Sequence, residues 1–374
     1  MGGSIFVTSF KGGVGKTTVC ANLAGALCNL GHTVLVVDGD FGMRCMDIVL
    51  GLENEALFDL GDVLAGRTEL ERAVLQSPRV PSLSFLPAPM NCRVPPGREA
   101  VAGVIDALIA AHKAAGQTAP SSHPECRPNP LEAEAVAHLL RITEVAGVPI
   151  VIVHLSTKEA LLEVMRARAR GQQVYVETCP HYLLLDDSRY DQPDYSEAAR
   201  FVCAPPLRKQ ADQEALWAAL ADGTIQTVST DHCSFTLTQK DAGKGDFTKI
   251  PGGLPGVETR GILLYSEGVA KGRIPAEKMA EVLAENPAKL YGAFPRKGIL
   301  AAGSDADIVV IDPTKTGLIT ASDQIANVDY TPFEGFRTQG VIEQVYLRGQ
   351  LAVDHGEMKA GPIGTYIPRH PGAL

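Results

Sequence analysis

A glycine-rich loop set between an apolar run and an alanine-rich helix is the feature that most limits how this chain can fold. Residues 4–9 form a short β-branched and aromatic run, residues 10–15 hold the glycines, and residues 16–30 carry alanine and leucine at helical spacing before Gly31. Residues 33–37 form a second apolar run, which ends at Asp38. A strand, loop, helix and strand in this order predict half of a parallel α/β sheet.

The loop has the composition of a phosphate-binding site. Residues 11–18 read KGGVGKTT and fit the pattern G-x-x-x-x-G-K-[ST] if Phe10 is tolerated at its first position. Glycines let backbone N–H groups close on phosphate oxygens, and the helix N-terminus adds its positive end. We expect Lys16 to bridge the β- and γ-phosphates and Thr17 to ligate Mg²⁺. A glycine turn followed by an incidental Lys-Thr pair is the alternative.

With its additional lysine at position 11, the loop resembles the deviant Walker A loop of the MinD/ParA family of ATPases. The Asp38-Gly39-Asp40 turn resembles the start of that family's first switch region, and the resemblance covers about residues 1–100. It implies ATP and Mg²⁺ as ligands, with Lys11 reaching the nucleotide of a dimer partner and Asp40 positioning the metal shell or the attacking water. The family's D-x-x-A/P-G switch, later strands and C-terminal amphipathic membrane helix have no match here. The predicted nucleotide-binding residues are Lys11, Gly12, Gly13, Val14, Gly15, Lys16, Thr17, Thr18, Asp38 and Asp40.

The sequence pattern changes after residue 91. Residues 92–98 read CRVPPGR, which breaks any regular element, and residues 99–115 form one alanine-rich helical stretch. Residues 148–154 form an apolar strand that ends on histidine, and further strands are expected at 173–178 and 224–230. Each follows a helical stretch, which again predicts βα units with strands buried on both faces. From about residue 295 the pattern becomes short alternating strands with turns, which predicts a small β-rich module.

Motifs from residue 104 onward occur in a fixed order. They include LEAEAVAHLL, VIVHLS, YVETCPHYLLLD, CAPPLR, TVSTDHCSF, GSDADIVVIDP and DYTPFEG. Together they resemble the C-terminal part of the D-hydantoinases and dihydropyrimidinases, which are cyclic amidohydrolases. The resemblance implies a (β/α)8 barrel with two metal ions, usually zinc, at the carboxyl ends of its strands, and a small cyclic amide as substrate.

The two resemblances together give the predicted fold class, which is α/β. We expect a partial P-loop NTPase sheet, then a partial (β/α)8 amidohydrolase barrel, and then a small C-terminal β-rich module. The expected boundaries are 1–103 for the incomplete P-loop segment, 104–294 for the incomplete barrel and 295–374 for the β-rich module.

The second resemblance assigns four positions to the family's centre. His154, at the end of VIVH, matches a metal-ligating histidine. Asp231 in TVSTDHC matches the aspartate that ligates one metal and carries a proton from the bridging hydroxide to the leaving amide nitrogen. Ala204, where relatives often have serine, and Gly252 match positions that hold the substrate through main-chain groups. Without this context a strand-end histidine would indicate a packing role.

Other metal ligands of the family have no counterpart in the sequence. The nine histidines contain no H-x-H pair, and the family's strand histidine is matched by the run Arg98-Glu99-Ala100. The barrel's first half is replaced by the MinD-like segment. Two protein ligands are fewer than the three that hold even a single catalytic zinc. We therefore expect an inactive centre in the chain alone, unpaired strand edges, and low stability or dependence on a partner.

Composition excludes some classes of protein. The net charge of −9 and the pI near 5.5 argue against a nucleic-acid binder. The eight cysteines are scattered, with no CxxC pair, and are expected to be reduced thiols. The chain shows no signal-peptide pattern and no apolar run as long as a membrane span, so a cytoplasmic location is expected.

Three interpretations stay open at this point. The first is a hydrolase of cyclic amides by family, and the second is a MinD-type ATP-binding positioning protein with a C-terminal passenger. The third is a non-functional hybrid or an assembly artefact, joined within residues 98–108, which fit a helix of either family. A homo-oligomer is possible in the first case, since relatives of the C-terminal part often form tetramers.

Overall fold

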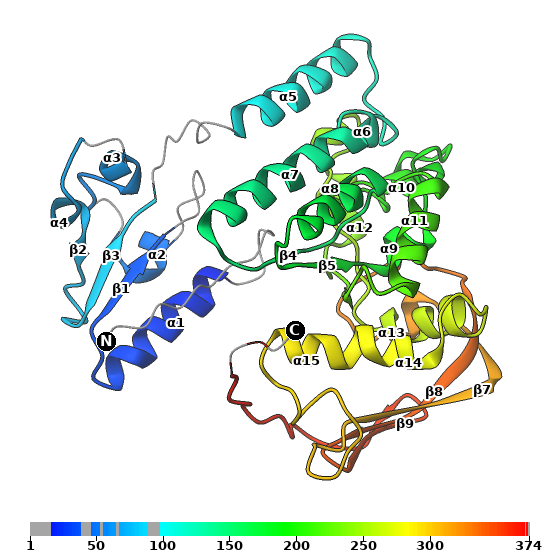
Figure 1. Ribbon diagram of the computed structural model, residues 1–374. Coiled ribbons are helices and arrows are strands. Elements are labelled where there is room, and N and C mark those ends of the chain that lie inside the picture. Colours follow the sequence, from blue (N-terminus) through cyan, green and yellow to red (C-terminus); the bar gives the residue numbers. More distant parts are fainter. Residues whose placement is uncertain are drawn as a thin grey trace. The chain divides into compact units, whose positions relative to one another are not determined.

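The computed structural model describes residues 16–38, 46–52, 55–64, 67–88, 98–370 and 372. The predicted phosphate-loop residues Lys11 to Gly15 and the switch residue Asp40 lie outside these ranges, as do the side chains of residues 16–18. The chain divides into two compact units, residues 1–99 and residues 100–374, which are described separately (Figure 1).

The first unit contains a small mixed sheet with short helices. Strand β1 (Val34–Val37) pairs in parallel with β3 (Leu83–Leu86), which pairs antiparallel with β2 (Leu75–Gln76). Helix α1 (Lys16–Asn29) presents Ala24 and Cys28, one turn apart, to Val36 and Phe85 of this sheet, as a one-sided apolar stripe does. The remaining helices are α2 (Met46–Leu50), α3 (Leu60–Leu64) and α4 (Leu70–Ala73).

The second unit contains a parallel sheet whose strands are separated along the chain by helices. Strand β5 (Val174–Thr178) lies between β4 (Ile150–Ile152) and β6 (Thr227–Val228) and pairs in parallel with both. Helices α7 (Asn129–Ala146) and α8 (Lys158–Ala169) pack along each other next to β4 and β5 (Figure 1). Alternate residues of β5 and both residues of β6 are buried, as expected for a parallel sheet covered by helices.

Other helices of this unit surround the sheet. They are α5 (Arg98–Ala114), α6 (Ser122–Glu125), α9 (Pro180–Leu184), α10 (Tyr195–Ala199), α11 (Gln210–Ala221), α12 (Leu237–Asp241), α13 (Arg260–Leu264), α14 (Ala276–Ala280) and α15 (Asn286–Leu290). Short 3-10 turns are η1 (Asp187–Tyr190), η2 (Phe247–Lys249) and η5 (Ala321–Asp323), and π-helical turns are η3 (Tyr265–Val269) and η4 (Glu281–Glu285). One continuous apolar core joins α7, α8 and α11 to the strands.

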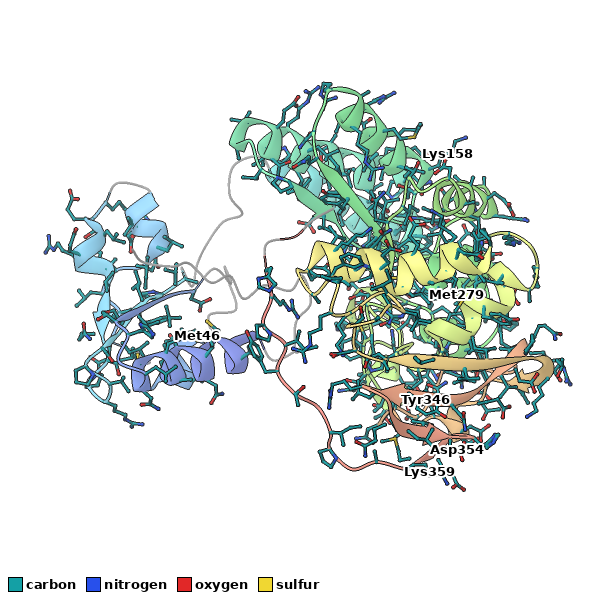
Figure 2. All side chains as sticks on the ribbon, turned by 60° about the horizontal axis from the view of Figure 1, so that its bottom comes forward. Met46, Lys158, Met279, Tyr346, Asp354 and Lys359 are labelled. Carbon is teal, nitrogen blue, oxygen red and sulfur yellow. The ribbon has the colours of Figure 1, made fainter. Side chains whose placement is uncertain are left out.

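The C-terminal strands form an antiparallel sheet in the order β10-β9-β8-β7. These strands are β7 (Ile308–Leu318), β8 (Arg337–Leu347), β9 (Gln350–Asp354) and β10 (Glu357–Met358). Figure 2 labels Tyr346 and Asp354 on this sheet. Strand β8 packs on the preceding helical layer, where a Cβ at Gly340 would lie 2.6 Å from the Tyr265 ring. Glycine is required at that contact, so the sheet fits the helices closely.

Across the described ranges, none of the helices combines the length and apolar character needed to cross a bilayer.

Candidate functional site

Polar side chains gather where the three parallel strands β4, β5 and β6 end. His154 follows β4 by two residues, Glu177 lies near the end of β5, and Asp231 follows β6 by three residues. Parallel strands end at one edge of their sheet, which is where such folds carry their binding residues. The structure therefore places the two predicted metal-ligand positions, His154 and Asp231, at the same edge.

Both of these residues have a left-handed backbone. His154 has φ 44° and Asp231 has φ 41°, values that a residue with a Cβ adopts only at an energetic cost of about 1–2 kcal/mol. The neighbouring backbone holds them there, because Leu155 N–H donates to the Glu177 carbonyl (2.9 Å) and Ser229 N–H donates to the Thr178 carbonyl (3.0 Å). Strain of this kind is concentrated at functional sites.

Glu177 connects the two positions electrostatically. Burial raises the pKa of its carboxyl group, and the hydrogen bond from Ser229 and the nearby His154 lower it. Asp231 raises the pKa further, and Arg260 lowers it. The charges of both predicted ligand positions thus act on the largely buried Glu177 carboxyl group. A further group there, the Cys179 thiol, has a pKa held well above its usual value by burial.

The predicted main-chain positions also lie together. A Cβ built on Gly252 would lie 3.5 Å from Ala204 Cβ and 3.7 Å from Ala204 N. The two segments are joined by a hydrogen bond from Gly253 N–H to the Val202 carbonyl (3.0 Å). Ala204 and Gly252, 48 residues apart in the sequence, thus form one continuous backbone surface.

This surface is connected to the loop that carries Asp231. Cys233 N–H donates to the Leu254 carbonyl (2.9 Å), and His232 forms a parallel bridge with Leu254. His232 Nδ1 also accepts a hydrogen bond from Gly256 N–H (3.1 Å), so this histidine supports the loop. The geometry brings Asp231 and the Ala204–Gly252 surface into one hydrogen-bonded framework.

The buried His123 holds the backbone directly before Ala204. His123 Nε2 donates to the Cys203 carbonyl (2.8 Å), and its Nδ1 accepts from Arg127 Nη1 (3.2 Å). Burial lowers the pKa of His123 from its ordinary value of 6.5 to about 3, and the Arg127 charge acts in the same direction. The ring is therefore neutral at pH 7, with its proton on Nε2.

The segment after His154 is held by a buried ion pair. Arg208 donates to Glu132 Oε2 (2.9 Å), to Ser156 Oγ (3.1 Å) and to the Arg127 carbonyl (2.6 Å). Glu132 also accepts from Ser156 N–H (2.8 Å) and from the Ser156 hydroxyl. Since the side chains of Arg208 and Glu132 are 5% and 11% exposed, this pair fixes the loop from inside the core.

The donor set does not fit the expected two-metal centre. In residues 16–38, 46–52, 55–64, 67–88, 98–370 and 372, no three histidine, cysteine, aspartate or glutamate side chains are grouped so as to hold a metal ion. The predicted ligand positions, His154 and Asp231, are two, whereas a catalytic zinc has three ligands from protein.

The structure describes only some of the predicted nucleotide-binding residues. Helix α1 (Lys16–Asn29) includes the backbone of the predicted residues Lys16, Thr17 and Thr18. Asp38 follows β1, is buried, and donates its backbone N–H to the Leu86 carbonyl (3.0 Å). Lys11, Gly12, Gly13, Val14, Gly15 and Asp40 lie outside the described residues, and for Lys16, Thr17 and Thr18 only the backbone is described.

Two residues of the site were missed by the sequence analysis. Glu177 is the one charged residue of β5, whose sequence is VYVET, and that contrast is a signal that could have identified it. Arg260, whose Nη1 donates to the Val228 carbonyl (3.3 Å), comes from a helix 29 residues after Asp231, and no local pattern indicates its place.

Comparison with known families confirms the two-part organisation. The model of the amidohydrolase family matches residues 102–352, and the model of an AAA domain matches residues 3–94. The first match covers most of the second unit, including the site at the ends of β4, β5 and β6.

Individual relatives match the same region. A D-phenylhydantoinase of Escherichia coli is 44% identical over 274 residues, which are 71% of this chain and 59% of that protein. The crystal structure of a dihydropyrimidinase from Brevibacillus agri has a TM-score of 0.70 at 41% identity, covering 73% of this chain and 59% of that one. A D-hydantoinase from Bacillus sp. AR9 has a TM-score of 0.70 at 43% identity, covering 73% and 60%.

The chain thus spans about three-fifths of the length of these relatives. The fold of its second unit is of the amidohydrolase type. On the evidence of residues 102–352, the chain belongs to the amidohydrolase family.

Proposed function

We propose that the second unit is the substrate-holding and proton-transferring part of a hydantoinase-type centre for the hydrolysis of cyclic amides, and that this chain alone does not complete that centre. The observation that carries the proposal is that hydrogen bonds connect the loop of Asp231 to the Ala204–Gly252 backbone surface. His154 lies at the same strand edge as Asp231. The D-phenylhydantoinase and dihydropyrimidinase relatives support a cyclic amide as the substrate class.

Each group has a distinct task in this proposal. A flat ring with amide N–H and C=O groups can pair with backbone groups at Ala204 and Gly252, and such pairing is largely independent of side chains. Serine in place of Ala204 is therefore not needed for binding. In the proposed hydrolysis, the oxygen of a water molecule bonds to the ring carbonyl carbon and Asp231 takes the water proton. Asp231 then gives this proton to the amide nitrogen as the C–N bond breaks.

The centre is incomplete because its donor atoms are too few. The sequence lacks an H-x-H pair, and His154 and Asp231 alone cannot hold two cations. We assign residues 104–294 to a partial (β/α)8 barrel and residues 295–374 to its β-rich module. Among the described strands, β4 and β6 are the two edges of an open parallel sheet, whereas a closed barrel has no edges.

Binding of hydantoin tests the substrate assignment without requiring turnover. We expect the full chain to bind hydantoin weakly, with a dissociation constant of about 1–10 mM by calorimetry. Gly252→Val should weaken binding at least about tenfold, because its side chain would occupy the space beside Ala204. Gly261→Ala is the matched control, since a Cβ at Gly261 meets no neighbour within 4 Å. No binding by the wild-type chain, or equal binding by Gly252→Val, would reject the assignment.

A second proposed activity is nucleotide binding by residues 1–103, supported by the AAA-domain match over residues 3–94. Lys16→Ala should weaken ATP binding at least about tenfold, because it removes the cation expected at the β- and γ-phosphates. Equilibrium dialysis with Mg·ATP measures this. A wild-type chain that retains no ATP at about 1 mM nucleotide would remove this activity from the account.

A further inference from the structure

Lys240 is fully buried and donates three hydrogen bonds to main-chain carbonyls. It lies on the short helix α12, with 0% of its surface exposed. Its Nζ is 2.7 Å from the Val202 carbonyl, 2.7 Å from the Pro251 carbonyl and 2.8 Å from the Gly253 carbonyl. An ammonium group has three N–H donors, so these three carbonyls use its full capacity.

The three carbonyls belong to the two segments that form the Ala204–Gly252 surface. Val202 is two residues before Ala204, and its carbonyl also accepts from Gly253 N–H (3.0 Å). Pro251 and Gly253 lie directly on either side of Gly252, so Gly252 is held between two fixed peptide groups. Lys240 is therefore the one side chain in the described residues shown to bond both segments.

The cation also changes the donor strength of Gly252. The Pro251 carbonyl and the Gly252 N–H belong to one peptide group, and a cation on the oxygen polarises the whole group. The Gly252 N–H becomes a better donor toward a ligand carbonyl as a result. A hydrophobic side chain at position 240 could fill the same volume but could not provide this effect.

We propose that Lys240 is a positioning residue for substrate, which fixes the backbone of residues 202–204 and 251–254 and strengthens Gly252 N–H as a donor. This inference rests on the proposed function for its ligand, a cyclic amide. The positioning of the two segments is independent of that ligand and can be measured without it.

Hydrogen exchange of the full chain tests the positioning. In Lys240→Met, and to a smaller extent in Lys240→Gln, amides of residues 202–204 and 252–254 should exchange at least about tenfold faster, because the carbonyls of these segments lose their charged donor. Amides of β5 and β8 should change less than about twofold. Lys244→Met, an exposed lysine four residues away, is the control and should change neither set.

Chemical rescue distinguishes the ammonium group from the volume that it fills. In Lys240→Ala, propylammonium should restore slow exchange of the two segments, whereas propanol, a neutral molecule of similar size, should not. The proposal would be overturned if amide exchange became faster over the whole unit or did not become faster at all. Equal rescue by propylammonium and propanol would also overturn it. Failure of both Lys240→Met and Lys240→Gln to fold would also overturn it, because Lys240 would then serve the core as a whole.

Hydantoin binding separates this inference from the proposed function. Lys240→Gln should weaken binding at least about tenfold relative to wild type and to Lys244→Met. If wild type binds and Lys240→Gln binds equally well, the inference about Lys240 fails and the proposed function stands. If wild type does not bind at all, the proposed function fails and the exchange measurement alone decides the positioning.

Discussion

At the scale of single residues, the site depends on backbone positions that other residues cannot occupy. Gly253 is the clearest case, because a Cβ there would lie 2.0 Å from Cys233 Sγ. His154 and Asp231 keep left-handed backbones despite their side chains. The close contact at Gly253 and the backbone strain at His154 and Asp231 are typical of residues selected for a site rather than for stability.

Replacing Gly253 should destabilise the second unit. We expect Gly253→Ala to lower the free energy of unfolding by about 2–3 kcal/mol, because the methyl group collides with Cys233 and the loop must shift. Urea denaturation measures the change. Gly261→Ala, within helix α13, should be neutral or stabilising by up to about 1 kcal/mol. Equal effects of the two substitutions would contradict the close contact at Gly253.

The buried His123 should make stability depend on pH. Its pKa of about 3 in the folded protein is below the ordinary 6.5, so the unfolded chain binds more protons between these values. The free energy of unfolding should therefore fall as the pH drops from about 6.5, by up to about 1.4 kcal/mol per pH unit. Denaturation curves at pH 7, 6 and 5 test this. His123→Gln keeps a donor for the Cys203 carbonyl and should show a shallower slope, whereas an unchanged slope would exclude His123 as the cause.

At the scale of secondary-structure elements, a buried ion pair joins helix α7 to two loops of the site. Glu132 lies on α7, and Arg208 connects it to Ser156 near His154. We expect Arg208→Met to destabilise the protein by about 3 kcal/mol, since it leaves the Glu132 carboxylate buried without its cation.

An exposed ion pair on helix α7 serves as the control for the buried pair. The side chains of Arg141 and Glu144 are 64% and 34% exposed, so Arg141→Met should destabilise the protein much less than Arg208→Met does. Both variants can be compared by urea denaturation. Similar values for Arg208→Met and Arg141→Met would mean that the buried pair does not hold the elements together.

The elements themselves were largely predictable from the sequence, but their ends were not. The strands predicted at 148–154, 173–178 and 224–230 are found as β4, β5 and β6, which in the structure are Ile150–Ile152, Val174–Thr178 and Thr227–Val228. The first and third strands are shorter than predicted, and beyond their carboxyl ends the chain turns at His154 and Asp231, whose left-handed backbones leave the strand direction. Composition does not indicate that turn, since histidine and aspartate occur in many backbone conformations.

The candidate site was predictable only where motifs mark it. His154, Asp231, Ala204 and Gly252 follow from the order of motifs, and the structure places Ala204 against Gly252. Lys240 was not predicted, because its acceptors at Val202 and Gly253 lie 38 residues before it and 13 after it. Only the folded chain brings these carbonyls to one ammonium group.

At the scale of the whole molecule, two sequence families meet in one chain. Residues 3–94 match the AAA domain and residues 102–352 match the amidohydrolase family, while the two compact units divide at residue 99. The chain spans 59% of the length of the D-phenylhydantoinase that it matches. We propose for this molecule that the second unit holds substrate and moves a proton but lacks donors for the metal centre.

Ring opening by the purified full chain tests that claim most directly. Hydantoin and dihydrouracil should be incubated with the chain and excess zinc, and the open-chain product measured alongside bound zinc. We expect product to form no faster than it does without protein, because His154 and Asp231 are too few ligands for a catalytic zinc. Turnover that rises with bound zinc and disappears in Asp231→Asn would contradict it.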